Sequence, residues 1–228
     1  MKEFERMTKK EVVVFCLMSV LAGIMIGIGG ASSLLANNLV PGAWGRLIGG
    51  VLFSLGMYAI ITYEMRLCTG MAALLPTLGI KNCWRLPVCF LGNSIGVGIT
   101  SLLVAFSPLS NLVIPQAQSL ILSKLSVEMP VLSSLCSSIL CGVLITASIW
   151  AVKHAPSRGL NGTVGVILPI VVFAFCGFDH SVANMMYFYY LGEVSWRVVW
   201  YILFSIAGNL IGGVLMPLVI ILKNGKEN

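Results

Sequence analysis

Long runs of apolar residues, separated by short polar connections, occupy most of this chain. A helix needs roughly 20 predominantly apolar residues to cross the hydrocarbon core of a bilayer. Runs of about that length are Val12–Leu35, Leu47–Leu67, Leu86–Phe106, Val131–Val152, Val164–Leu191 and Val198–Leu222. The pattern predicts an all-α membrane protein with six transmembrane helices, which form one transmembrane domain over residues 1–228.

Polar residues interrupt the second and the fifth of these runs. The second run leads into Tyr63-Glu64-Met65-Arg66-Leu67-Cys68-Thr69-Gly70, and the fifth contains Cys176-Gly177-Phe178-Asp179-His180. Ionisable residues at membrane depth usually face a cavity or a pathway, and unwound backbone is tolerated there only against protein or water. We therefore expect both helices to be broken around the central polar site of a small pore, with Gly70, Gly177 and Asp179 at the breaks.

Each break also has a simpler interpretation. The second helix could end early, which would leave Glu64 and Arg66 at the membrane interface. In the fifth run, a buried hydrogen bond between Asp179 and His180 could pin one helix to another. A direct relay between these two adjacent residues is disfavoured, because neighbouring side chains rarely point the same way.

A repeated pair of residues relates the two halves of the chain. Gly92-Asn93 in the third run matches Gly208-Asn209 in the sixth, and each pair has another Gly four residues after its first. The broken helices are then the middle helices of two three-helix halves, at about residues 1–110 and 125–228. Because an odd number of spans turns the second half over, we predict an inverted repeat with its site near the midplane. A chance match in a glycine-rich chain is the alternative.

Composition and charge agree with a multi-pass membrane protein. The chain is 58% hydrophobic and 10% charged, and its mean hydropathy is +0.97, which excludes an ordinary soluble domain. Basic residues dominate the side of the termini and are scarce on the other side, as the positive-inside rule requires of cytoplasmic loops. We expect both termini in the cytoplasm, a cell-membrane location and no nucleic-acid partner. The terminal side has Lys2, Arg6, Lys9, Lys10, Lys81, Arg85, Lys153, Arg158, Lys223 and Lys226, and the other side has Arg46, Lys124 and Arg197.

The sequence offers no pattern for a metal or cofactor, so we expect neither. The seven cysteines are scattered without metal-ligand spacing and are interpreted as packing residues. A haem held by two His is disfavoured because His154 lies in a loop, and there is no His-Glu-x-x-His or phosphate-binding loop. An intramembrane enzyme and a purely structural membrane scaffold are distant alternatives to a transport protein.

Two motifs resemble those of the formate/nitrite transporter family. Residues 176–185, Cys-Gly-Phe-Asp-His-Ser-Val-Ala-Asn-Met, are close to that family's Gly-Phe-Glu-His-Ser-x-Ala-Asn motif. Residues 67–70, Leu-Cys-Thr-Gly, resemble its Leu-Phe-Thr-Gly element, and the Gly-Asn pairs match as well. The resemblance covers essentially the whole chain. It implies an aquaporin-like helical bundle with one pore in each subunit of a homopentamer, which passes small monovalent weak-acid anions. Formate or nitrite is the expected substrate, and hydrosulfide or a short monocarboxylate is the alternative.

The resemblance also implies roles for single residues. His180 corresponds to the central pore histidine, Thr69 to the threonine that faces it, and Asn209 to a pore-facing asparagine. Lys124 lies near a lysine that attracts anions at the outer mouth. Apolar constrictions correspond to Phe53, Met57, Leu67 and Phe173.

Four positions depart from the family pattern. Asp179 stands where a Glu is usual, Gly142 where many members have a pore Asn, and Arg66 where an acidic residue is common. Cys68 replaces a common aromatic residue, which could widen the pore.

Apolar constrictions around a polar chamber suggest how an anion could cross. A bare anion in a low-dielectric ring costs several kcal/mol, roughly the penalty of an unpaired buried charge. A weak acid avoids this cost if it is protonated on the way, and histidine can donate a proton or a hydrogen bond near neutral pH. The sequence leaves open whether passage is passive or proton-coupled.

Overall fold

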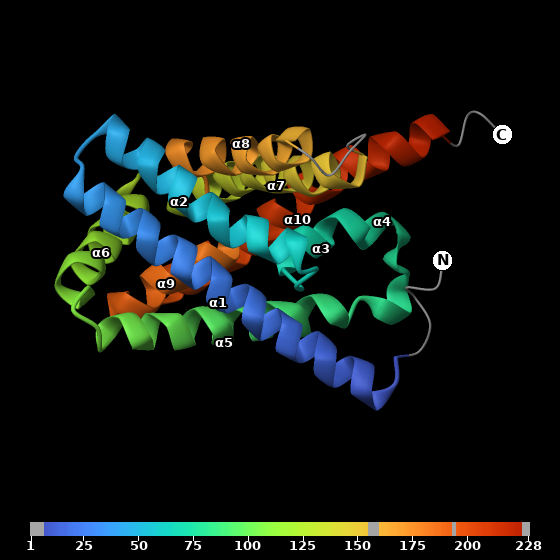
Figure 1. Cartoon of the computed structure of the whole chain (residues 1–228), viewed down its shortest axis with the longest axis horizontal. Helices are drawn as coiled ribbons and strands as arrows, with labels where there is room; N and C mark the ends of the chain where they lie inside the picture. Colours follow the sequence, from blue (N-terminus) through green and yellow to red (C-terminus); the bar gives the residue numbers. More distant parts are fainter. Residues whose placement is uncertain (1–6, 155–159, 193–194, 225–228) are drawn as a thin grey trace.

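The computed structural model describes residues 7–154, 160–192 and 195–224, and in these residues it contains helices and no strands. Five helices are long and apolar enough to cross a membrane, and α8 with α9, bent by 41° at a break, makes a sixth span. The prediction of an all-α membrane protein is therefore confirmed (Figure 1). The helices are α1 (Lys9–Leu39), α2 (Ala43–Thr62), α3 (Cys68–Met71), α4 (Leu75–Leu78), α5 (Arg85–Ala105), α6 (Ser110–Ser126), α7 (Pro130–His154), α8 (Leu160–Cys176), α9 (Ser181–Leu191) and α10 (Trp196–Asn224).

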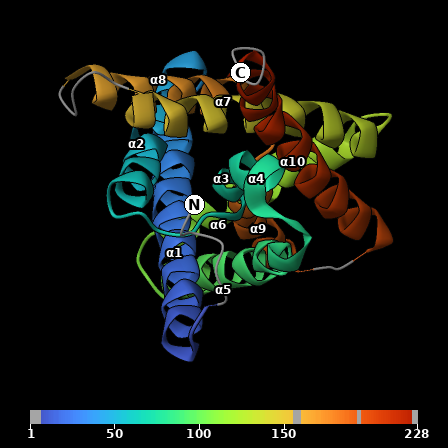
Figure 2. The ribbon, with the colours of Figure 1, turned by 90° about the vertical axis from the view of Figure 1, so that its right-hand side faces the viewer.

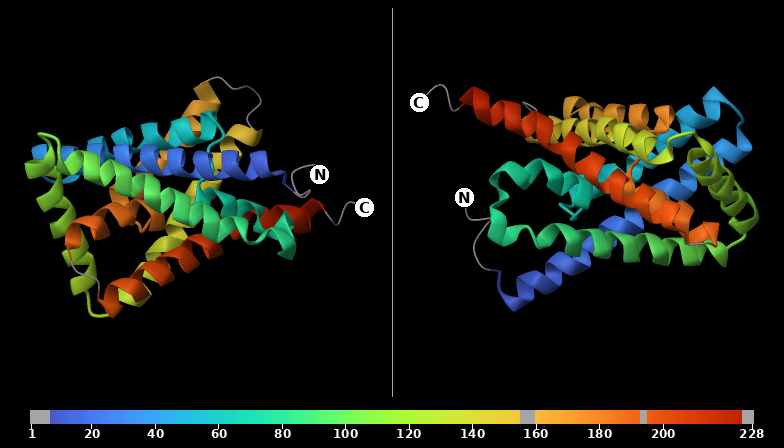
Figure 3. Two further views of the ribbon diagram at one scale, coloured as in Figure 1. Left: turned by 90° about the horizontal axis from the view of Figure 1, so that it is seen from below. Right: turned by 180° about the vertical axis from the view of Figure 1, so that it is seen from behind.

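The start of α1 and the end of α10 lie at the same end of the bundle, and α6 lies across the opposite end (Figures 1 and 3). Seen along the bundle, α3 and α4 occupy its middle and the longer helices surround them (Figure 2). A 3-10 turn at Ala72–Leu74 joins α3 to α4, so that Cys68–Leu78 forms one short apolar helix. This segment and α9, called half-helices below, follow the two breaks.

Close contact between helix backbones explains two glycines. A Cβ atom on Gly23 of α1 would collide with the carbonyl of Asn93 in α5, and one on Gly142 of α7 would collide with the carbonyl of Asn209 in α10. Small residues at such crossings let helices approach closely. Position 142 therefore faces the α10 backbone, and it leaves no room for the pore-facing Asn that many family members have there.

The two breaks begin with the same turn. After α2, Glu64 N–H donates to Ile61 C=O (3.3 Å) and Met65 N–H to Ile60 C=O (2.9 Å). After α8, Gly177 N–H donates to Ala174 C=O (3.1 Å) and Phe178 N–H to Phe173 C=O (3.0 Å). This pair of bonds defines a Schellman motif, which needs a left-handed residue at its turn.

Glu64 (φ 52°) and Gly177 (φ 73°) are the left-handed residues of these turns. Gly177, which was expected at a break, therefore lies at the turn of the second one. The prediction for Gly70 is wrong, because Gly70 lies inside α3 and the turn is at Glu64. The sequence misled here because glycine is the usual residue for a left-handed turn.

Candidate functional site

The two half-helices begin side by side in the middle of the bundle. His180 is the N-cap of α9, and Thr69 is the second residue of α3. Thr69 Oγ1 lies 2.9 Å from His180 Nε2, and each residue is only 1% exposed. The N-terminus of a helix carries partial positive charge. Thr69 and His180 therefore lie at two positively charged helix N-termini, a position that favours an anion.

The contacts of His180 define which ring nitrogen carries the hydrogen. The N–H of Ala183 donates to His180 Nδ1 at 3.0 Å, so Nδ1 offers a lone pair. In the neutral ring the hydrogen is then on Nε2, which donates to Thr69 Oγ1. The hydroxyl hydrogen of Thr69 is left to point elsewhere. The pair can thus present a hydrogen-bond donor to an anion.

Aromatic and aliphatic side chains enclose this pair. The Phe173 ring stacks on the His180 ring with centroids 5.9 Å apart, and Phe53 meets Phe173 edge-on at 5.4 Å. Met57 and Leu67 belong to the same buried cluster. The structure therefore places Phe53 and Phe173 against His180, and Met57 and Leu67 in the same buried cluster as these two rings.

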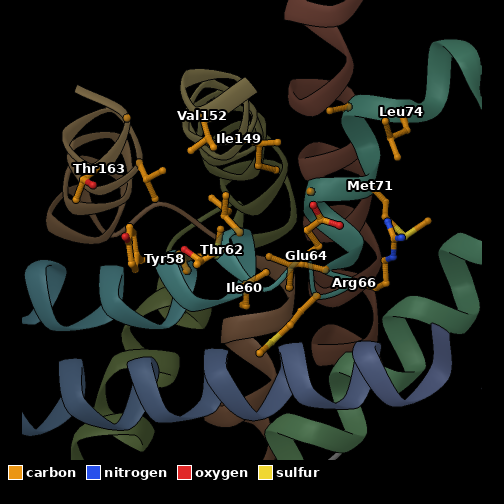
Figure 4. A pocket seen from close by; sticks show the side chains of 18 residues that line it. Tyr58, Ile60, Thr62, Glu64, Arg66, Met71, Leu74, Ile149, Val152 and Thr163 are labelled. Atoms are coloured by element: carbon orange, nitrogen blue, oxygen red, sulfur yellow. The ribbon is translucent and has the colours of Figure 1, made fainter. Parts of the chain in front are cut away.

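A cavity of about 750 Å³ opens beside this cluster. Its wall comes from the end of α2, the first break, the half-helix after it, the end of α7 and the start of α8. The elements that form this wall lie toward the end of the bundle that holds the start of α1 (Figure 1). Met57 and Leu67 line the cavity, and so do the charged residues Glu64 and Arg66 (Figure 4). We call this cavity the vestibule.

Asp179 fixes the second break. Its Oδ1 accepts hydrogen bonds from Lys124 Nζ (2.6 Å), Asn184 Nδ2 (2.8 Å) and Tyr201 OH (2.9 Å). Its backbone N–H donates to Ser137 Oγ at 3.0 Å. Asp179 is 3% exposed and joins α6, α7, α9 and α10. These hydrogen bonds tie the second break to the neighbouring helices, and none of them goes to His180.

Lys124, expected to attract anions at the outer mouth, is tied to the same break. Besides Asp179, its Nζ donates to the carbonyl of Gly177 at 2.9 Å. The side chain is 18% exposed, and the carboxylate offsets its charge. Attraction of anions by Lys124 is therefore weaker than a free lysine would give.

Two asparagines hold the half-helices in the same way. Asn93 Oδ1 accepts the N–H of Cys68 (2.8 Å), and its Nδ2 donates to the carbonyls of Ser19 and Arg66 (both 2.8 Å). Asn93 is fully buried, and its contacts with Cys68 and Arg66 hold the start of the first half-helix. Asn209 does the same for the second one: Oδ1 accepts from Ser181 N–H (2.8 Å), and Nδ2 donates to the carbonyls of Ser138 (2.8 Å) and Asp179 (2.9 Å).

Asn209 was expected to face the pore, but both of its amide hydrogens are bound to backbone carbonyls. This places it as a positioning residue. Asn93 was missed as a site residue, although the repeated Gly-Asn pair was the signal that could have found it. Tyr201 was missed because nothing in the sequence connects it with Asp179.

Cys68 does not widen the space around His180. Its side chain packs with Phe15, Met71 and Cys89, and Sγ lies 3.6 Å from the Leu86 carbonyl. Among the residues that the structure describes, no three His, Cys, Asp or Glu side chains are grouped so as to hold a metal ion.

A buried polar pair between two half-helices, inside a bundle of apolar spans, defines a membrane transport protein with a central polar site. Residues 1–222 match the family described as Formate/nitrite transporter, and the chain belongs to this family. It is a multi-pass membrane protein.

Relatives and solved structures agree with the family assignment. The nitrite transporter NirC of Salmonella typhimurium (strain LT2) is 27% identical over 221 residues, which cover 88% of this chain and 79% of that protein. The formate channel FocB of Escherichia coli (strain K12) is 27% identical over 193 residues, or 79% and 67% of the two chains. Both are transport proteins.

The fold is that of solved channels. An FNT family ion channel superposes with a TM-score of 0.79 at 23% identity, covering 91% of this chain and 88% of that one. A pentameric formate channel with formate bound gives a TM-score of 0.75 at 20% identity, covering 91% and 94%.

Proposed function

We propose that this protein passes small monovalent weak-acid anions, formate or nitrite, across the cell membrane, with one pore in each subunit of a homopentamer. Its relatives are named as a nitrite transporter and a formate channel, and a structure of the same fold is a pentameric formate channel. The observation that carries the proposal is the 2.9 Å contact between Thr69 Oγ1 and His180 Nε2. It places a polar pair at the start of both half-helices and inside an apolar shell.

The positive ends of the half-helices and the Thr69 hydroxyl attract the anion to this pair. The buried side chains of Phe53, Met57, Leu67 and Phe173 act as the constrictions on its path. They make a bare charge costly and so favour passage of the neutral acid or of an anion that stays hydrogen-bonded. Asn93, Asn209 and Asp179 keep the two half-helices in place.

His180 serves as a hydrogen-bond donor through Thr69. Its Nδ1 accepts the Ala183 N–H, so taking up a second proton would break the cap of α9. This supports passive passage, in which any proton travels with the substrate. Proton coupling through His180 is the alternative.

The distribution of basic residues supports an orientation with both termini in the cytoplasm. The vestibule is then the cytoplasmic entrance. Gly177 and Asp179, with Lys124 bound to them, stand toward the outer side.

The test uses purified protein in liposomes without ATP. Gradients of formate, nitrite, hydrosulfide, acetate and lactate are imposed in turn, and flux is followed by light scattering and an internal pH dye. We expect formate or nitrite to enter far faster than in protein-free liposomes. Faster passage of hydrosulfide or lactate would assign the alternative substrate, and no flux for any of the five would refute the proposal. Native mass spectrometry in mild detergent should show five copies.

A further inference from the structure

Glu64 stands out because of its backbone conformation. Among the residues that the structure describes, it is the only one other than glycine with a positive φ, at 52°. A Cβ atom crowds the backbone in this region, so glycine is the usual choice. Residues kept in sparsely populated conformations tend to lie at functional sites.

The second break shows that the turn does not need a glutamate. Gly177 holds the same position there, with φ of 73° and the same pair of hydrogen bonds. Glycine would therefore serve the first break without strain. The backbone conformation therefore does not explain why a glutamate occupies this position. The explanation must lie in the Glu64 side chain.

The Glu64 side chain lies at the entrance to the central site. It is exposed and lines the vestibule together with Arg66 (Figure 4). The vestibule also reaches Met57 and Leu67, and Leu67 immediately precedes the half-helix that carries Thr69. An anion that enters from this end passes the carboxylate before it meets the apolar constriction.

Size cannot select among small anions in a cavity of about 750 Å³, but charge can. We propose that Glu64 is a specificity-determining residue that keeps multiply charged anions out of the vestibule more strongly than monovalent ones. The energy of an ion in a fixed potential is proportional to its charge. A negative potential that lowers the local concentration of a monoanion by some factor therefore lowers that of a dianion by the square of this factor.

The inference rests on the proposed passage of small anions, and liposome flux tests it. Formate, or whichever anion of the panel the wild type carries, is supplied to the vestibule side with oxalate, a dianion at neutral pH, as competitor. Glu64→Gln keeps the size of the side chain and removes its charge. We expect flux to rise about threefold at low salt and the inhibitory oxalate concentration to fall about ninefold. Both changes should shrink in roughly 1 M salt, where screening acts within about 3 Å.

Two further variants complete the test. Glu64→Gly should match Glu64→Gln in flux and in inhibition by oxalate. It should also melt at a higher temperature than the wild type, because glycine adopts the left-handed conformation of this turn without strain. Glu128→Gln is the matched control: Glu128 is exposed between α6 and α7, at the opposite end of the bundle, and its loss should change neither quantity. The proposal would be overturned if both Glu64 variants kept the wild-type flux and the wild-type inhibition by oxalate. It would also be overturned if the flux of the monovalent anion and the inhibitory oxalate concentration changed by the same factor. A wild type that carries no anion refutes the proposed function instead.

Discussion

In each interrupted span, a long helix ends in a Schellman turn, an asparagine from another helix binds the next segment, and a half-helix follows. The side chains on these equivalent backbones differ. Glu64, Arg66, Leu67 and Thr69 in the first break correspond to Gly177, Asp179, His180 and Val182 in the second. The shared backbone positions two helix N-termini at the centre. The unequal side chains supply the chemistry: a hydroxyl from one half, an imidazole from the other, and opposite charges beside them.

The largest effect on stability should come from Asp179, which stands in the second break where the first break has Arg66. Asp179→Ala leaves Lys124 without its buried carboxylate and takes an acceptor from Tyr201 and Asn184. We expect the free energy of unfolding to fall by about 3–5 kcal/mol, as when one partner of a buried ion pair is removed. Melting temperature and pentamer yield in detergent measure the loss.

The double variant Asp179→Ala, Lys124→Met is the control for this prediction, because it also removes the Lys124 charge that the single variant leaves without a partner. It should recover part of the stability. A single variant as stable as the wild type would mean that the second break does not depend on Asp179.

The two asparagines should matter equally. Asn93→Leu and Asn209→Leu each remove three hydrogen bonds between a buried side chain and backbone groups. We expect each to lower the free energy of unfolding by several kcal/mol, since each buried polar group left unpaired costs about 1–3 kcal/mol. Thermal melting of the two variants side by side checks this. If only Asn209→Leu lost flux while keeping its stability, Asn209 would act in the pore and the equivalence would fail.

These asparagines also show how far sequence could lead. Apolar runs of membrane length, charges inside two of them and the Gly-Asn pairs predicted the spans and both breaks. That Thr69 faces His180 was implied only by the resemblance to the formate/nitrite transporter family. The pairs could not reveal that the Asn209 amide binds backbone, because a motif does not say where a side chain points. Nor could sequence place the first turn at Glu64, since a glutamate in a left-handed conformation breaks the rule that pointed to Gly70. Tyr201 reaches Asp179 only through the packing of α10.

The chemistry assigned to the first half depends on one hydroxyl. Thr69→Val keeps the shape of the side chain but removes the donor, which leaves a bound anion one charge-assisted hydrogen bond short, or roughly 1–3 kcal/mol. We expect formate flux at low concentration to fall several-fold. The melting temperature should fall modestly as well, because the buried Nε2–H of His180 loses its acceptor.

Thr77→Val is the matched control, because Thr77 is exposed and its hydroxyl binds only the local carbonyl of Leu74. It should carry anions at the wild-type rate. Wild-type flux in Thr69→Val would mean that the first break does not line the pathway.

The smallest expected change concerns the pH profile of His180→Asn. Asparagine is a good N-cap residue, so it can replace His180 Nδ1 in accepting the Ala183 N–H, and the start of α9 should persist. The contact from Nε2 to Thr69 is lost, which should lower the flux. Because both contacts of His180 use the neutral ring, the variant should keep the wild-type shape of flux against pH between about 5 and 8, where an unperturbed histidine titrates. Flux measured across that range beside the melting temperature decides the matter. A profile that flattens in a stably folded variant would show that His180 exchanges protons with the substrate, and the second half would then contribute an acid-base group and not only a hydrogen bond.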